Sequence, residues 1–125
     1  MGTFSSFEEI IAWQKARMLN VDFYEVSSQN FHFAKDFSLR DQMRRSSISI
    51  SSNIAEGFER ETVKEFIRFL YIAKASAGEF RSQLYLAYDL KYLTDADFTS
   101  INLKINEISK LISGLIKYLV STLKP

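Results

Sequence analysis

The sequence predicts an all-α protein, folded as an antiparallel up-down four-helix bundle in one domain over residues 1–125. The chain has four glycines and one proline in 125 residues, and so few breakers favour long helices over strands and turns. Four side-chain oxygens are each followed three residues later by an acid, a pattern typical of helix starts. Apolar residues then recur in steps of three and four. These signals predict helices at roughly 7–27, 39–59, 63–92 and 95–122.

The first predicted helix begins with Ser6 as its capping residue and Glu9 as the acid. Its apolar residues fall on two sides. One side comprises Phe7, Ile11 and Met18, and the other comprises Ala12, Leu19, Phe23 and Val26. Because only one side can face a bundle core, the second apolar side predicts a surface for a partner.

The connection to the second helix, NFHFAKDFSL at residues 30–39, is aromatic and has no helical period. We expect the rings of Phe31, Phe33 and Phe37 to cover one end of the core. A ligand-stacking role for these rings is the alternative. Ser38 with Asp41 then gives the start signal of the second helix.

The second helix carries the serine-rich stretch RRSSISISSNIAEGFER, residues 44–60. Its core seam comprises Met43, Ser47, Ile50, Ile54 and Gly57. A separate line comprises Arg45, Ser49, Ser52 and Glu56, with Asn53 beside it. Small polar side chains allow a close helix contact and need hydrogen-bond partners when buried. We therefore expect Asn53 and Glu56 to be buried against Ser76, Gly78 and Glu79 of the third helix.

The third and fourth helices have the clearest apolar periods. Thr62 with Glu65 starts the third helix, and Thr94 with Asp97 starts the fourth. The third seam comprises Phe66, Leu70, Ala73, Ala77, Phe80, Leu84 and Ala87, and the fourth comprises Phe98, Ile101, Ile105, Ile108, Ile112, Leu115 and Leu119. Alternating steps of four and three are typical of near-parallel packing in a bundle.

Composition and motifs give no support for an enzyme. The chain has no cysteine and one histidine, His32, so zinc and di-iron sites lack their usual ligands. Glycine-rich phosphate loops and a nucleophile elbow are absent from the sequence. Glu56 and Glu59 form a Glu-x-x-Glu pair, which a magnesium-dependent nucleotide hydrolase would use, but no second matching pair follows. We predict no catalytic residue, no metal site and no cofactor.

The net charge is only +1, so a surface that binds nucleic acid would need basic residues clustered in one region of the protein. Two groups of basic residues are candidates for phosphate contacts: Arg40, Arg44 and Arg45 at the start of the second helix, and Lys110, Lys117 and Lys124 at intervals of seven. A solvated outer face would show the same lysine spacing. The sequence has no membrane span and no signal peptide, and we expect a cytoplasmic protein without a membrane partner.

Four stretches resemble one bacterial family: FEEIIAWQKAR at 7–17, FHFAKDFSL at 31–39, RRSSISISSNIAEG at 44–57 and KEFIRFLYIAKASAGEFRSQL at 64–84. The family comprises four-helix bundles encoded in intervening sequences of 23S rRNA genes, often called S23 ribosomal proteins. Its motif falls on Ser49, Ser52, Asn53, Glu56, Gly57, Ser76 and Glu79. Ser51 stands where the family usually has proline, so we expect a straighter second helix.

The resemblance implies a ring-like homo-oligomer, a pentamer, and it does not imply a role in translation. A related bundle, the accessory variability protein of diversity-generating retroelements, works with a reverse transcriptase and binds nucleic acid. Our leading hypothesis is a non-enzymatic, oligomeric bundle that acts as an RNA- or DNA-binding accessory. A protein-interaction scaffold without a nucleic-acid role is the alternative, and a magnesium-dependent nucleotide hydrolase is a minor one.

Overall fold

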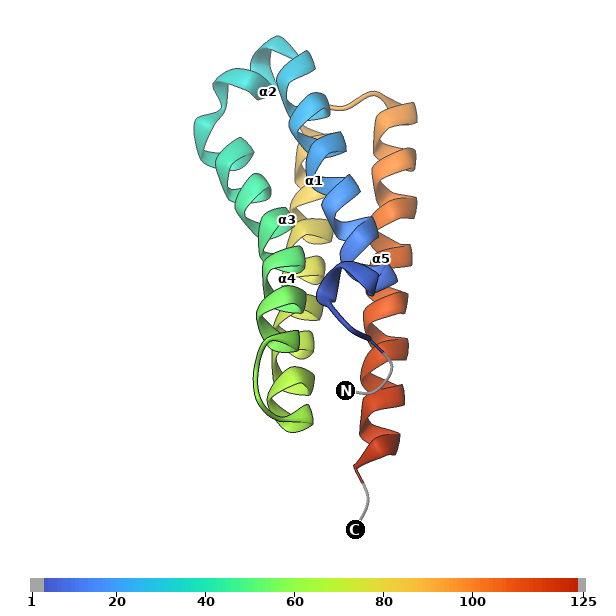
Figure 1. The fold of residues 1–125 in the computed structure, drawn as a ribbon. Helices are drawn as coiled ribbons and strands as arrows, with labels where there is room; N and C mark the ends of the chain where they lie inside the picture. The colour runs from blue at the N-terminus through green and yellow to red at the C-terminus, as the bar shows by residue number, and fades with distance from the viewer. Residues whose placement is uncertain (1–3, 124–125) are drawn as a thin grey trace.

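The computed structural model describes residues 4–123, which form an all-α up-down bundle of four major helices (Figure 1). The elements are the 3-10 turn η1 (Phe7–Glu9), α1 (Ile11–Gln29), α2 (Phe31–Lys35), α3 (Phe37–Phe58), α4 (Val63–Asp89) and α5 (Asp95–Thr122). The predicted fold class is confirmed at the level of this bundle. No helix within residues 4–123 has an apolar stretch sufficient to cross a membrane.

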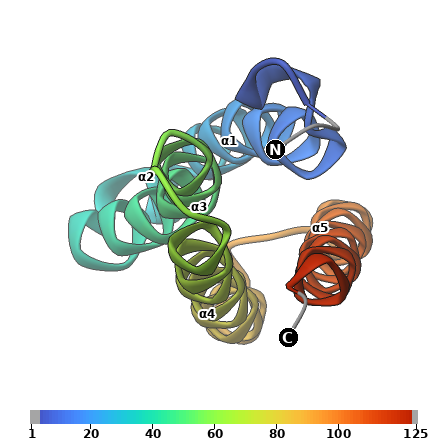
Figure 2. The same ribbon diagram turned by 60° about the horizontal axis from the view of Figure 1, so that its bottom comes forward.

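The four long helices pack in a closed order around the core. Helix α1 packs against α3 and α5, and α4 packs against the same two helices. Figure 2 shows α1 and α4 on either side of α3, with α5 set apart from α3. Helices α3 and α5 are therefore diagonal partners, and their outer faces lie on opposite sides of the bundle. Helix α2 lies at the end of the bundle where α4 connects to α5 (Figure 1).

The predicted seams form the core. All seven predicted residues of the α4 seam are buried, as are Met43, Ser47, Ile50, Ile54 and Gly57 of α3. In α5 the four isoleucines of the predicted seam and Leu119 are buried, whereas Phe98 and Leu115 are half-buried. Next to Leu115, the inner position is taken by Ile116, which is buried although it was not part of the predicted seam. Phe23 of α1 lies at the aromatic centre, edge-on to Phe33 and to Phe80. In α1 the side containing Leu19 and Phe23 faces the core.

Two of the four predicted helix starts are confirmed. The hydroxyl oxygen of Thr62 accepts a hydrogen bond from the Glu65 N–H at 3.1 Å, and that of Thr94 accepts one from the Asp97 N–H at 3.0 Å. The start at Ser6 is wrong, because its side chain caps no N–H. The Ser5 N–H instead donates to the carboxylate of Glu9 at 3.0 Å, residues 7–9 form a 3-10 turn, and α1 begins later.

The second helix also starts elsewhere than predicted. The carboxylate of Asp36 accepts from the Leu39 N–H at 3.1 Å, so Asp36 caps α3 in place of Ser38. Asn30 caps α2 by accepting from the Phe33 N–H at 2.9 Å. These two caps turn Phe33 into the core, where it is fully buried. The expectation for Phe31 and Phe37 is wrong: their side chains are 65% and 61% exposed, since each lies on the outer side of its capped helix.

Candidate functional site

Buried serines tie α3 to α1. The Ser47 hydroxyl donates to the side-chain oxygen of Asn20 at 2.7 Å, and the Asn20 side-chain N–H donates to Ser51 Oγ at 3.1 Å. Ser47 and Ser51 are buried, so this link satisfies groups that would otherwise be costly to bury. The sequence did not reveal Asn20, because its role depends on the antiparallel register of α1 and α3.

A second polar link ties α3 to α4. Ser46 Oγ donates to Gln83 Oε1 at 2.8 Å, and the hydroxyls of Ser49 and Ser76 lie 2.9 Å apart. The Asn53 side chain donates to Ser49 Oγ at 2.9 Å and is half-buried. The serine-rich stretch of α3 therefore holds both neighbouring helices through hydroxyl and amide groups.

The rest of the predicted polar line lies on the surface. Ser52 and Glu56 of this line are exposed, and so is Glu79 of α4, which was predicted to pack against it. The expectation that Glu56 is buried is wrong, because Glu56 is on the outer side of α3 and its carboxylate pairs with Arg60 at 2.9 Å. Glu59 is also exposed, and no group of three or more His, Cys, Asp or Glu that could hold a metal occurs within residues 4–123.

Helices α3 and α4 approach each other closely at Gly57. A Cβ at this position would lie 2.6 Å from Phe69 Cβ and 3.1 Å from Phe66 Cδ1. The first of these atoms is fixed to the backbone of α4, so it cannot move aside independently of the helix. At Gly78 and Gly114, by contrast, an added Cβ would meet no atom within 4 Å.

The most distinctive surface lies where α2 and α3 meet beside α1. We call it the aromatic–basic corner, comprising the rings of Tyr24, Phe31 and Phe37 and the cations of Lys35, Arg40, Arg44 and Arg45. Three of these cations lie over rings: Lys35 Nζ is 4.2 Å from the centroid of Phe31, Arg40 Cζ is 4.8 Å from that of Phe37, and Arg44 Cζ is 4.2 Å from that of Tyr24. Such cation–π contacts fix the cations close to exposed aromatic surface.

Hydrogen bonds further position two of the arginines. Arg40 donates from Nε to the Asp41 carboxylate at 2.9 Å and from Nη1 to the Ala34 carbonyl at 2.8 Å. Arg44 donates from Nε to Ser27 Oγ at 3.1 Å and from Nη2 to Ser28 Oγ at 3.0 Å. Both guanidinium planes are therefore pre-oriented by the protein.

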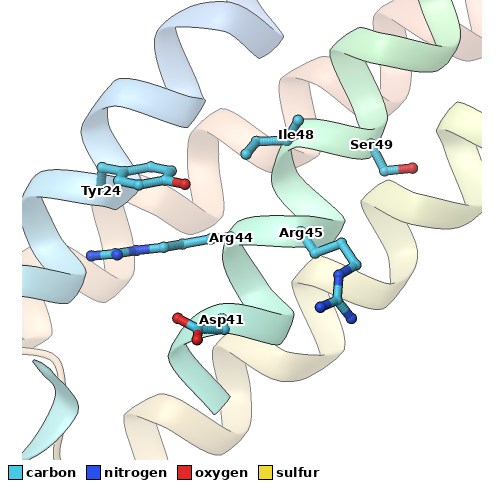
Figure 3. Close-up of a pocket in the computed structure, with 6 residues that line it drawn as sticks. All are labelled: Tyr24, Asp41, Arg44, Arg45, Ile48 and Ser49. Carbon is cyan, nitrogen blue, oxygen red and sulfur yellow. The ribbon is translucent and has the colours of Figure 1, made fainter. Parts of the chain in front are cut away.

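A groove of about 420 Å³ runs along this corner between α1 and α3. Its lining comprises Tyr24, Asp41, Arg44, Arg45, Ile48 and Ser49 (Figure 3). Figure 3 shows the side chain of Arg44 extending alongside the ring of Tyr24, whereas Arg45 projects away from that ring. Arg45 is exposed, and no residue between 4 and 123 gives its guanidinium a hydrogen bond or an ion pair.

The corner has an excess of positive charge. Residues 35–45 contain four cations and two carboxylates, whereas the whole chain has a net charge of only +1. Both carboxylates have internal partners: Asp41 pairs with Arg40, and Asp36 accepts the hydroxyl of Tyr92 at 2.9 Å in addition to capping α3. The hydrogen bond to Asp36 raises the pKa of Tyr92 above its usual value, so this link holds throughout the neutral pH range.

The second predicted basic group is far from the first. Lys110 and Lys117 are exposed on the outer side of α5, which is diagonal to α3. Lys124 lies outside the described residues. The arginines and the lysines therefore form separate surfaces, and two of the three arginines, Arg40 and Arg44, lie over exposed rings. Tyr24 was not predicted as a site residue. Its one distinguishing feature in the sequence is that it falls on neither apolar side of its helix.

Comparison with known proteins identifies relatives across most of the chain. Residues 8–114 match the model of a family described as 23S rRNA-intervening sequence protein. A crystal structure at 1.70 Å resolution, of a protein with unknown function from the S23 ribosomal protein family of Bacteroides thetaiotaomicron VPI-5482, has a TM-score of 0.80 with this fold. The two sequences are 30% identical over 86% of this chain and 96% of the other. No curated protein matches the chain.

Proposed function

Because the chain belongs to the 23S rRNA-intervening sequence protein family, we propose that it is a non-enzymatic, self-associating bundle that binds RNA or DNA through the aromatic–basic corner. The observation that carries the proposal is the unpartnered guanidinium of Arg45 next to the pre-oriented Arg44, at the edge of an open groove. Arginine forks suit phosphate oxygens, and the nearby carboxylates are already engaged. The family name makes ribosomal RNA the first nucleic acid to test.

A titration of the full-length protein with a fluorescent 23S rRNA fragment at several salt concentrations tests this proposal. We expect affinity to fall with salt, because each phosphate contact releases counterions and contributes about 0.7 to 0.9 to the slope of log K against log salt. Arg45→Gln should reduce this slope by about 1. Lys110→Gln on α5 is the matched control and should leave the slope unchanged. Absence of salt-dependent binding at micromolar protein would contradict the proposal.

The proposal of self-association is supported by the outer face of α4. Five large apolar side chains are exposed there: Tyr71 at 54%, Ile72 at 40%, Tyr85 at 49%, Leu86 at 49% and Leu90 at 46%. These side chains form two groups along the helix, Tyr71 with Ile72 and Tyr85 with Leu86 and Leu90, and exposed apolar groups of this kind are typical of contacts between proteins. The ring-like pentamer implied by the family resemblance would cover part of this face. Sedimentation equilibrium should then give a mass of five 14.5 kDa chains, whereas a monomer at micromolar concentration would overturn this part of the proposal.

A scaffold for protein partners is the second candidate, and the outer side of α1 favours it. Three apolar side chains are exposed there: Ile11 at 50%, Met18 at 61% and Val21 at 59%. Affinity capture with and without nuclease separates the two candidates. A defined protein that stays bound after nuclease, and that dissociates from a Met18→Glu variant, would favour the scaffold; bound material that disappears with nuclease would favour the nucleic-acid role.

A further inference from the structure

We infer that the nucleic acid bound at the aromatic–basic corner is single-stranded, with unpaired bases stacked on the exposed rings of Phe37 and Tyr24. This inference rests on the proposed function and adds the class of ligand to it. Stacking of bases on aromatic rings requires bases that are free of a duplex, because paired bases have their faces covered by their neighbours. A surface built for duplex would instead direct polar side chains into a groove.

The exposure of the rings is the first argument. The side chains of Phe31, Phe37 and Tyr24 are 65%, 61% and 43% exposed, so a large part of each ring lies outside the core and is open to a ligand. Each ring has a cation over one face. The exposed part of each ring can receive a second planar group, so a base stacked there would add to the existing contact between cation and ring.

The second argument is the restraint of the arginines. Arg40 and Arg44 each donate two hydrogen bonds to protein oxygens, so neither is extended in the way that readout of base edges in a major groove requires. Their guanidinium groups lie over the rings of Phe37 and Tyr24 instead, with Cζ 4.8 Å and 4.2 Å from the ring centroids, which suits contact with a phosphate beside a stacked base. Arg45, exposed beside them, is available for a phosphate on the edge of the groove.

The dimensions of the surface fit a short segment of strand. Phe37, Asp41, Arg44 and Ile48 recur in steps of four and three along the outer side of α3. From residue 37 to residue 48 the helix rises about 16 Å at 1.5 Å per residue. At 3.4 Å per stacked nucleotide, this length accommodates about four or five nucleotides.

Binding of three oligonucleotides of equal length tests the inference: an unstructured single strand, its duplex, and a strand of equal charge with abasic sites in place of bases. We expect the full-length protein to bind the single strand most tightly. The abasic strand keeps the phosphates and loses the stacking partners, so its affinity should be lower by at least about 5- to 150-fold, which is the loss expected for a single stacked base.

Protein variants give the complementary test. Phe37→Leu and Tyr24→Leu keep an apolar side chain, and each should weaken single-strand binding several-fold without changing its salt dependence, because stacking releases no counterions. Tyr118→Leu, an exposed tyrosine on α5, is the matched control and should bind as the wild type does. Far-ultraviolet circular dichroism and thermal unfolding establish that each variant is folded.

The outcomes separate the inference from the proposed function. Equal affinity for duplex and single strand, or wild-type affinity in both aromatic variants, would overturn the inference and leave the proposed function standing. If the protein binds none of the three oligonucleotides, both the inference and the proposed function are overturned. Binding to vesicles of anionic lipid or to an acidic peptide that Phe37→Leu abolishes, with no binding to single strands, would assign the corner to another ligand class.

Discussion

Replacement of Phe23 by alanine is expected to lower the free energy of unfolding by about 3 to 5 kcal/mol. Phe23 is fully buried, and its ring lies 5.9 Å from that of Phe33 and 5.0 Å from that of Phe80, edge-on to both. The substitution removes these contacts and leaves a cavity between α1, α2 and α4, which the surrounding side chains can fill only in part. Urea unfolding followed by circular dichroism measures the loss.

Val21→Ala on the same helix is the matched control for Phe23→Ala. Val21 is 59% exposed, so its truncation should change stability by no more than about 0.5 kcal/mol. Both variants must be compared with the wild type at one protein concentration, because self-association adds to the apparent stability. A Phe23→Ala protein that unfolds at the same urea concentration as Val21→Ala would contradict the described core.

Gly57→Ala is expected to destabilise the protein by about 1 to 3 kcal/mol, although alanine is the better helix former. The reason is the space available: the new Cβ would lie 2.6 Å from Phe69 Cβ, and relief requires α3 and α4 to separate. The displacement would also strain the hydrogen bond between Ser49 and Ser76 farther along the same contact. The change in the urea midpoint at constant slope gives the cost.

Gly114→Ala is the matched control for Gly57→Ala, because it makes the same change in helix propensity without a steric clash. Gly114 lies inside α5, and a Cβ there would meet no atom within 4 Å. The same substitution should therefore stabilise the protein by about 0.4 to 1 kcal/mol, through helix propensity and a less flexible unfolded chain. Opposite signs for the two substitutions are the expected result. Stabilisation by Gly57→Ala would show that the two helices do not approach closely at this point.

The long helices could be predicted because their signals are local and agree with one another. The seam of α4 steps regularly from Phe66 to Ala87, and Thr62 is the single capping oxygen directly before it. Residues 30–39 were predicted poorly, because Asn30, Asp36 and Ser38 are three competing capping side chains within a short window. Asp36 accepts a hydrogen bond from the hydroxyl of Tyr92, which is distant in the sequence, and no local pattern can reveal that contact.

The candidate site could be predicted in part for the same reason. The arginines of α3 were visible as a cluster, whereas their partner Tyr24 depends on how α1 lies against α3. Glu56 was wrongly predicted to be buried because the sequence does not show how α3 is rotated about its axis relative to its neighbours. The period groups Glu56 correctly with Ser49 and Ser52 on one line, but only the packing decides where on that line burial ends. Ser49 faces Ser76, and the other two side chains face outward.

The most direct measurement of the central claim is photo-crosslinking of the full-length protein to a single-stranded RNA that contains 4-thiouridine, followed by mass spectrometry of tryptic peptides. Binding at the aromatic–basic corner predicts crosslinks in the peptides 18–35 and 36–40, which contain Tyr24, Phe31 and Phe37. These crosslinks should decrease in Arg45→Gln and persist in Lys110→Gln. Crosslinks confined to the peptides 105–110 and 111–117 of α5 would place the nucleic acid on the opposite side of the bundle and contradict the claim.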